Sequence, residues 1–179
     1  MNRFFGHLST ILRHRHQVIR HCFKAGIGFQ GLRHDLSKLS PAEFIPGVRN
    51  YQGNRSPNEH ERETRGYSAA WLHHKGRNKH HFEYWIDYIP AMRRTGPVKM
   101  PLKYVVEMFC DRVAAGKIYR GKNYTEDSPL AYFLGGKPNR IIHPETSDLL
   151  EGWLRMLAEQ GEDKTFAHIR ALVKDGGEY

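Results

Sequence analysis

The sequence lacks the features that mark several classes of protein. Only two of its 179 residues are cysteines, Cys22 and Cys110, and they form no CxxC pair, which argues against a disulfide scaffold and a cysteine zinc site. No apolar run approaches the ~18 residues that a membrane-spanning helix needs. The apolar stretch near the N-terminus is too short for a secretory signal. We therefore expect a cytoplasmic protein that does not cross a membrane.

Runs of alternating apolar and polar residues, typical of half-buried strands, are also missing. Apolar residues recur at helical spacing instead, and prolines and glycines punctuate them. The spacing predicts an all-α fold of eight or nine helices, with a linker over 91–100. The helices that we expect cover 8–22, 32–39, 41–45, 59–74, 81–89, 101–116, 128–134, 146–157 and 166–173.

The length suits one domain over residues 1–179, with a core that carries the candidate site over 8–117. Residues 128–175 are expected to form a helical cover. The acidic helices over 145–175 would serve as structural cover or as an oligomer surface, so a homo-oligomer is one of the assemblies that we consider.

Acidic residues are absent before Asp35, although six basic residues stand there: Arg3, Arg13, Arg15, Arg20, Lys24 and Arg33. The whole chain has a net charge of +9, while residues 141–179 hold eight acidic and four basic residues. The positive excess therefore lies in the first 140 residues. Such a field attracts anions, so we expect an anionic small-molecule partner, with nucleic acid as the less favoured alternative.

The twelve histidines are grouped rather than scattered. The relevant ones are His14 and His21 on the first expected helix, His34 beside Asp35, and the pairs His73-His74 and His80-His81. Asp111 lies within an apolar helix, where a carboxylate is costly unless it is paired or bound to a cation. Imidazole and carboxylate together suit Fe, Mn, Zn or Ni. The sequence therefore predicts a centre for one or two divalent transition metal ions.

The doublet His34-Asp35, followed by Leu-Ser-Lys, resembles the His-Asp doublet of HD-domain metal-dependent phosphohydrolases. In that superfamily an earlier histidine in an H-x-x-x-V setting comes first, and His14 stands twenty residues before His34 in such a setting. A later helix supplies an aspartate within an Asp-Arg-Leu-Ala-Ala-like run, which Asp111 and the four residues after it match closely. The resemblance covers residues 14–115 and implies an all-α bundle of HD type.

The chain as a whole also resembles an uncharacterised family of small bacterial and phage proteins. The matching signatures are H-D-L-S-K-x-S-x-x-E-F, at residues 34–44, and W-x-x-H-K-x-x-N-x-H-H-x-x-Y-W, at residues 71–85. That family carries no established activity, so expectations about chemistry come from the superfamily alone.

The superfamily resemblance implies His14, His34, Asp35 and Asp111 around one ion. A second ion would share Asp35 and take His74 and His80, with His73 and His81 as alternates that the sequence does not separate. The gap between the two histidine pairs is shorter than the superfamily pattern. His21, seven residues from His14 on the same helix face, could replace it or support it.

Further residues are expected to handle the substrate. Lys38 stands four residues after His34, where its ammonium would offset the charge of a substrate phosphate. Glu43 is a candidate proton carrier or a partner that orients a ligand. We count Lys38 and Glu43 as candidate catalytic residues. Arg77, Asn78 and Arg112 are candidates for binding the remaining charge of the substrate.

Three functions fit these patterns. The first is a metal-dependent phosphohydrolase that uses a metal-activated water on a small phosphate ester or nucleotide. The second is an O₂-activating oxidoreductase with two irons on the same scaffold. The third is a basic nucleotide- or nucleic-acid-binding module with a structural metal and no catalysis. The basic residues are interleaved with the proposed ligands rather than gathered in a tail, which ranks the third function last.

Overall fold

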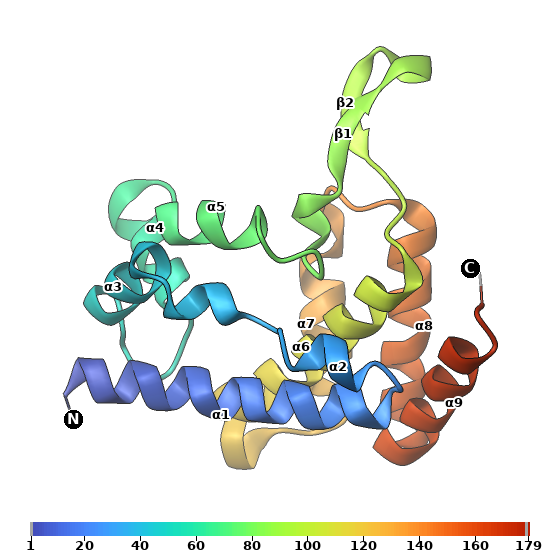
Figure 1. Ribbon diagram of the computed structural model, residues 1–179, viewed down its shortest axis with the longest axis horizontal. Helices are drawn as coiled ribbons and strands as arrows, with labels where there is room; N and C mark the ends of the chain where they lie inside the picture. The colour runs from blue at the N-terminus through green and yellow to red at the C-terminus, as the bar shows by residue number, and fades with distance from the viewer. Residues whose placement is uncertain (1, 178) are drawn as a thin grey trace.

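Helices dominate the computed structural model, which describes residues 2–177 and 179 (Figure 1). The predicted fold class and the predicted number of helices are confirmed. Among the described residues the α-helices are α1 (Arg3–Lys24), α2 (Gly28–Gly31), α3 (Pro41–Arg49), α4 (Pro57–Arg65), α5 (Ala69–Lys75), α6 (Leu102–Arg120), α7 (Ser128–Gly136), α8 (Pro144–Gln160) and α9 (Glu162–Lys174). Short 3-10 turns lie between them: η1 (Leu36–Leu39), η2 (Phe82–Tyr84), η3 (Pro90–Met92), η4 (Gly121–Asn123) and η5 (Lys137–Asn139).

The prediction of a second helix over 32–39 is wrong. The chain forms the single turn α2, then an irregular turn, then η1. The polar helix expected over 59–74 is divided into α4 and α5. Gly66 has φ 79°, a left-handed conformation that ends α4, and Ser68 caps α5 by accepting a hydrogen bond from the backbone N–H of Trp71 at 3.0 Å.

A β-hairpin replaces the aromatic helix and the linker that we expected over 81–100. Strands β1 (Ile86–Ile89) and β2 (Arg94–Pro97) pair antiparallel, and the hairpin projects away from the helices (Figure 1). Pro90 disfavours helical backbone at the residue before it, and Ile86, Tyr88 and Ile89 are residues that strands favour. Strands of four residues are too short to produce a clear alternating pattern in the sequence.

The apolar core lies where α6 packs between α1 and the C-terminal helices. Figure 1 shows α1 along one side of the molecule, with α3 near its N-terminal half and α9 near its C-terminal half. Fully buried core side chains include Val18, Cys22, Phe109, Val113, Leu154 and Ile169. Each such aliphatic or aromatic side chain contributes about 1.5–3 kcal/mol through burial. This core fixes α6 against α1 and thereby sets the positions of the polar groups described next.

No helix among the described residues is long and apolar enough to cross a membrane.

Candidate metal centre

The candidate ligands come from five separate segments that meet beside α6. His14 lies on α1, His34 and Asp35 lie in the turn before η1, His74 lies on α5, His80 follows α5, and Asp111 lies on α6. All the histidines among them and Asp35 are buried, with exposed fractions of 7% or less. The structure therefore brings together all six residues that the sequence analysis assigned to two ions.

The left-handed backbone conformation of Asp35 orients the side chains of the His34-Asp35 doublet. Asp35 has φ 53° and ψ 27° immediately before η1, a conformation that costs a residue with a Cβ about 1 kcal/mol or more. Neighbouring side chains on a regular helix would diverge by about 100°. The tight turn instead lets Nε2 of His34 lie 3.3 Å from Oδ2 of Asp35, so both side chains face the same point.

The first ligand group joins α1, the doublet and α6. Nε2 of His14 lies 2.9 Å from Oδ1 of Asp111, and Nε2 of His34 lies 3.6 Å from the same oxygen. Ligand atoms of His14, His34 and Asp35 lie within 4.8 Å of one another. Ligand atoms of His34, His80 and Asp111 also lie within 4.8 Å of one another, so the four residues that the superfamily resemblance implies for one ion lie together and His80 reaches them as well.

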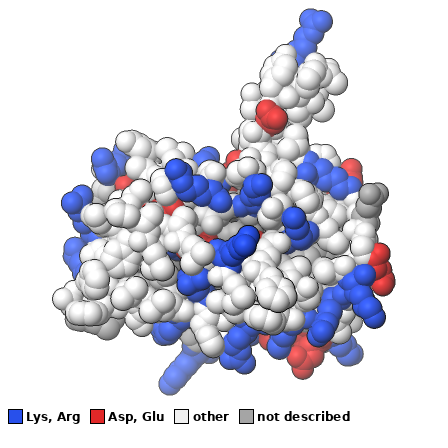
Figure 2. All heavy atoms as spheres, in the orientation of Figure 1, with Lys and Arg blue, Asp and Glu red and all other residues white. Residues whose placement is uncertain are grey.

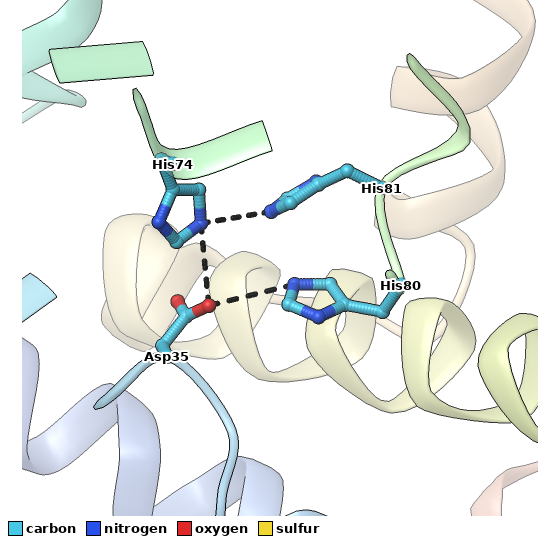
Figure 3. Close-up of side chains that lie close together, drawn as sticks. All are labelled: Asp35, His74, His80 and His81. Atoms are coloured by element: carbon cyan, nitrogen blue, oxygen red, sulfur yellow. Dashed lines mark hydrogen bonds and ion pairs between the residues drawn. The ribbon is translucent and has the colours of Figure 1, made fainter. Parts of the chain in front are cut away.

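The second ligand group shares Asp35 with the first (Figure 3). Oδ1 of Asp35 lies 3.2 Å from Nε2 of His74 and 3.5 Å from Nε2 of His80. His81 also points inward, with its Nε2 2.9 Å from that of His74. The sequence left His80 and His81 as alternatives, whereas the structure places both within 4.8 Å of the other ligand atoms.

Several buried atoms of the ligand residues form no well-shaped hydrogen bond among the described residues. They are both ring nitrogens of His14, Nε2 of His34, Nε2 of His80 and both carboxylate oxygens of Asp35, although Nε2 of His14 lies 2.9 Å from Oδ1 of Asp111 and Oδ2 of Asp35 lies 2.7 Å from Nζ of Lys38. Buried polar atoms without partners are rare because each costs about 1–3 kcal/mol. Imidazole nitrogens and carboxylate oxygens at these separations suit one or two divalent transition metal ions, and the residues present therefore fit the cofactor that the sequence implies.

Glu107, which the sequence analysis missed, links the two groups. Its Oε1 lies 3.0 Å from Nδ1 of His34 and 3.3 Å from Nδ1 of His80, so one carboxylate holds a histidine of each group with Nε2 turned to the centre. Carboxylates that accept from the outer nitrogen commonly orient histidine ligands of metals. The available signal was the spacing: Glu107 stands four residues before Asp111, on the same face of α6.

Glu43 orients a histidine of the second ligand group alone. Its two oxygens lie 2.7 Å from Nδ1 of His73 and 2.7 Å from Nδ1 of His74. His74 therefore presents Nε2 to Asp35, while His73 lies outside the ligand groups, against Glu43. The contacts favour a positioning role for Glu43 over that of a proton carrier.

The carboxylates of the centre need positive charge near them. Burial would raise the pKa of Asp35, but His34 and Lys38 outweigh it and hold that pKa well below the ordinary value. Burial would also raise the pKa of Asp111, and the adjacent His14 and His34 lower it in the same way. Burial would lower the pKa of His34, but Asp35 and Glu107 raise it to about 10. A bound cation would provide the same stabilisation in place of protons on the histidines.

Lys38 completes the centre at the wall of a cavity of about 910 Å³. Its Nζ lies 2.7 Å from Oδ2 of Asp35. His14, His74, His81 and Asp111 face the same cavity, so both ligand groups are open to it. Its other cationic lining residues are Arg55, Arg62, Lys75, Arg112, Arg120 and Arg140. We call this space the metal cavity.

Two of the three candidates for substrate binding lie elsewhere. Arg112 lines the metal cavity, and its buried Nε has no hydrogen-bond partner in the described part of the chain. Asn78 instead donates to Oγ of Ser37 at 2.8 Å and lies 3.1 Å from Nδ1 of His74. Arg77 and Asn78 both line a second, separate pocket.

His21 lies in the apolar core rather than at the centre. Its Nδ1 donates to the backbone carbonyl of Cys110 at 3.2 Å, and its Nε2 lies 2.8 Å from the side-chain amide of Gln17. Both ring nitrogens therefore have partners within the protein, whereas Nδ1 of His14 has none among the described residues.

Comparison with known families matches residues 3–156 to a family of unknown function, DUF5662, and the chain belongs to that family. No curated protein and no solved structure matches the chain.

Proposed function

We propose that this member of DUF5662 is a metal-dependent phosphohydrolase that acts on a small phosphate ester, such as a nucleotide. One observation carries the proposal: two His/Asp ligand groups share Asp35 and open into a cavity lined by cations. The order of the ligands along the chain, which resembles that of HD-domain phosphohydrolases, supports the same reading.

The ligands would divide between two ions. His14, His34, Asp35 and Asp111 would hold one, and His74, His80 and His81 would hold the other together with the shared Asp35. When bound, such ions supply a water nucleophile at neutral pH and polarise a phosphoryl oxygen. Glu107 accepts from Nδ1 of His34 and His80, and Glu43 accepts from Nδ1 of His74, so the Nε2 atoms of these histidines would be free to hold the ions.

Lys38 and Arg112 would offset the negative charge of the substrate phosphate. The ammonium of Lys38 lies 2.7 Å from Asp35 and faces the metal cavity, so a phosphate beside Asp35 would receive a charge-assisted hydrogen bond from it. Arg112 offers an unpaired, buried Nε from the same helix that carries Asp111. These two side chains would bind and orient the phosphate.

The size of the cavity favours an ester with a substantial organic group. About 910 Å³ lies at the upper end of the 300–1,000 Å³ typical of small-molecule sites and is far more than inorganic phosphate fills. Trp71, Phe82, Tyr119 and Tyr132 contribute aromatic surface to its walls. These rings would contact the part of the substrate away from the phosphate.

Metal analysis of protein purified without an affinity tag, followed by a panel of phosphomonoesters and phosphodiesters, tests the proposal. We expect one to two transition metal ions per chain and metal-dependent turnover. Less than about one ion per ten chains, unchanged by reconstitution, would contradict it. A visible absorption band and an electron paramagnetic resonance signal from coupled irons, without phosphoester turnover, would favour the oxidative alternative.

A further inference from the structure

A second pocket lies behind the metal centre, on the side of His80 and Glu107. Its volume is about 700 Å³. It shares no lining residue with the metal cavity. We call it the rear pocket, and its lining residues are Phe29, Gln30, Leu32, Arg33, Arg77, Asn78, Lys79, His80, Lys103, Tyr104 and Glu107.

Four exposed cations converge on the rear pocket from three segments. Arg33 follows α2, Arg77 and Lys79 follow α5, and Lys103 lies in the first turn of α6. None of them forms an ion pair among the residues that the structure describes, whereas several other lysines and arginines do (for example Lys24 with Glu162). The positive charge of the rear pocket is therefore not neutralised by a neighbouring carboxylate.

Glu107 is the one acidic residue in the described lining of the rear pocket, and both of its carboxylate oxygens already accept hydrogen bonds from other side chains. Oε1 lies within hydrogen-bond reach of His34 and His80, and Oε2 accepts from the side-chain amide of Gln30 at 2.5 Å. Glu107 therefore serves the metal centre and leaves the four cations without a counter-charge.

Two features place positive charge at the rear pocket and leave it available to an anion. The ammonium groups of Lys79 and Lys103 lie 5.9 Å and 5.1 Å from the centre of the Tyr104 ring, so one aromatic side chain of the pocket holds both of them without neutralising their charge. Lys103 also stands at the positive end of the α6 dipole, and the first turn of α6 has no acidic residue. Figure 2 shows lysines and arginines around a hollow in the middle of the face that it presents.

We propose that the rear pocket binds a small molecule carrying two or more phosphate groups. Guanidinium and ammonium groups are the side chains that proteins use for phosphate, and four of them match the charge of a diphosphate or triphosphate. The volume lies within the range of small-molecule sites. The segment 76–81 supplies both pocket cations and metal-centre histidines, so the occupant would contact the backbone that positions His80 and His81.

Calorimetric titration of the metal-loaded protein with imidodiphosphate, a diphosphate that resists hydrolysis, tests this site. The variant Arg33→Gln/Lys103→Gln removes two rear-pocket charges from exposed positions. Its control is Arg13→Gln/Arg20→Gln, which removes two exposed charges of α1 that line neither pocket. Metal content is measured after each titration, because the probe also chelates metals.

We expect the rear-pocket variant to lose one binding component, or to weaken it about tenfold or more, while the α1 control retains it. This component is independent of the proposed function, because it persists whether or not the metal cavity also binds the probe. Identical isotherms for the two double variants would overturn the assignment. Loss of single-stranded DNA binding in the rear-pocket variant, without competition by imidodiphosphate, would overturn it in favour of a nucleic acid.

Discussion

Two buried histidines of α1 are in opposite situations. His14, near the middle of the helix, is 7% exposed; its Nδ1 has no hydrogen-bond partner among the described residues, and its Nε2 faces Oδ1 of Asp111 at 2.9 Å in the metal centre. His21, two turns later, is 1% exposed, and both of its nitrogens have partners. The same helix therefore supplies a ligand-like histidine near its middle and an ordinary core histidine near its C-terminal end.

Helix α6 shows the same contrast between two of its faces, one apolar and one polar. Val106, Phe109 and Val113 are fully buried in apolar surroundings, whereas Glu107 and Asp111 face the histidines. A folded chain normally satisfies its buried polar atoms, so an unsatisfied cluster beside a satisfied core indicates a place where something else binds. Burial alone does not distinguish the two regions; the partners of the buried atoms do.

The largest effect should follow from Asp35→Asn, because this carboxylate belongs to both ligand groups. Loss of a charge that both groups use should release the metal ions and lower turnover of any phosphoester about a thousandfold. Metal analysis and initial rates measure the two effects together. The control is Asp163→Asn, which removes one carboxylate whose side chain is 97% exposed. Full metal content in Asp35→Asn would remove the basis for a shared ligand.

Lys38→Gln should separate substrate binding from metal binding. Lys38 contacts Asp35 at 2.7 Å, so its loss makes the centre more negative, and the metal ions should be retained. The phosphate would lose one charge-assisted hydrogen bond, and kcat/KM should fall about ten- to hundredfold. If metal content falls in step with activity, Lys38 supports Asp35 and does not bind substrate.

Glu107→Gln should weaken both metal sites, whereas Glu43→Gln should weaken one. Glu107 contacts His34 and His80, which the proposal assigns to different ions, while Glu43 contacts only His74 among the proposed ligands. Loss of such an orienting carboxylate typically lowers metal affinity about 10- to 100-fold. Competition with a chelator measures each site. Equal behaviour of the two variants would contradict the division of the ligands.

The sequence was sufficient to predict the helical class, because apolar spacing at 3.6 residues per turn persists through α1, α6, α8 and α9. It was insufficient for the hairpin of β1 and β2. Strands of four residues show too little periodicity, and the turn between them places Arg93 at φ 50°, a left-handed conformation that its residue type does not indicate.

The sequence also placed His14, Asp35 and Asp111 in one site, because their order along the chain resembles that of a known superfamily. It could not decide among neighbouring histidines or recognise Glu107. Those answers depend on which nitrogen each ring presents, and this is fixed by residues far away in the chain, such as Glu43 for His74. The residue types around Asp35 do not predict its left-handed conformation either.

The smallest effect should come from a substitution of His21, the histidine of α1 whose two ring nitrogens both have hydrogen-bond partners. Burial lowers the pKa of His21 to about 4 from an ordinary value of 6.5. The unfolded chain therefore takes up a proton at this residue as the pH falls from about 6.5, before the folded chain does. This removes free energy of unfolding between about pH 6.5 and 4, on the order of 2 kcal/mol by pH 5.

His21→Leu should abolish that part of the acid sensitivity. Urea unfolding of metal-free protein at pH 7 and pH 5 measures it, because the metal ligands contribute equally to both proteins and cancel in the difference. At pH 7 the variant should keep the metal content of the unmodified protein, since His21 bonds to Cys110 and Gln17 rather than to any ligand. Loss of metal from His21→Leu would mean that the satisfied and unsatisfied histidines of α1 belong to one functional unit, and the distinction drawn from their hydrogen-bond partners would fail.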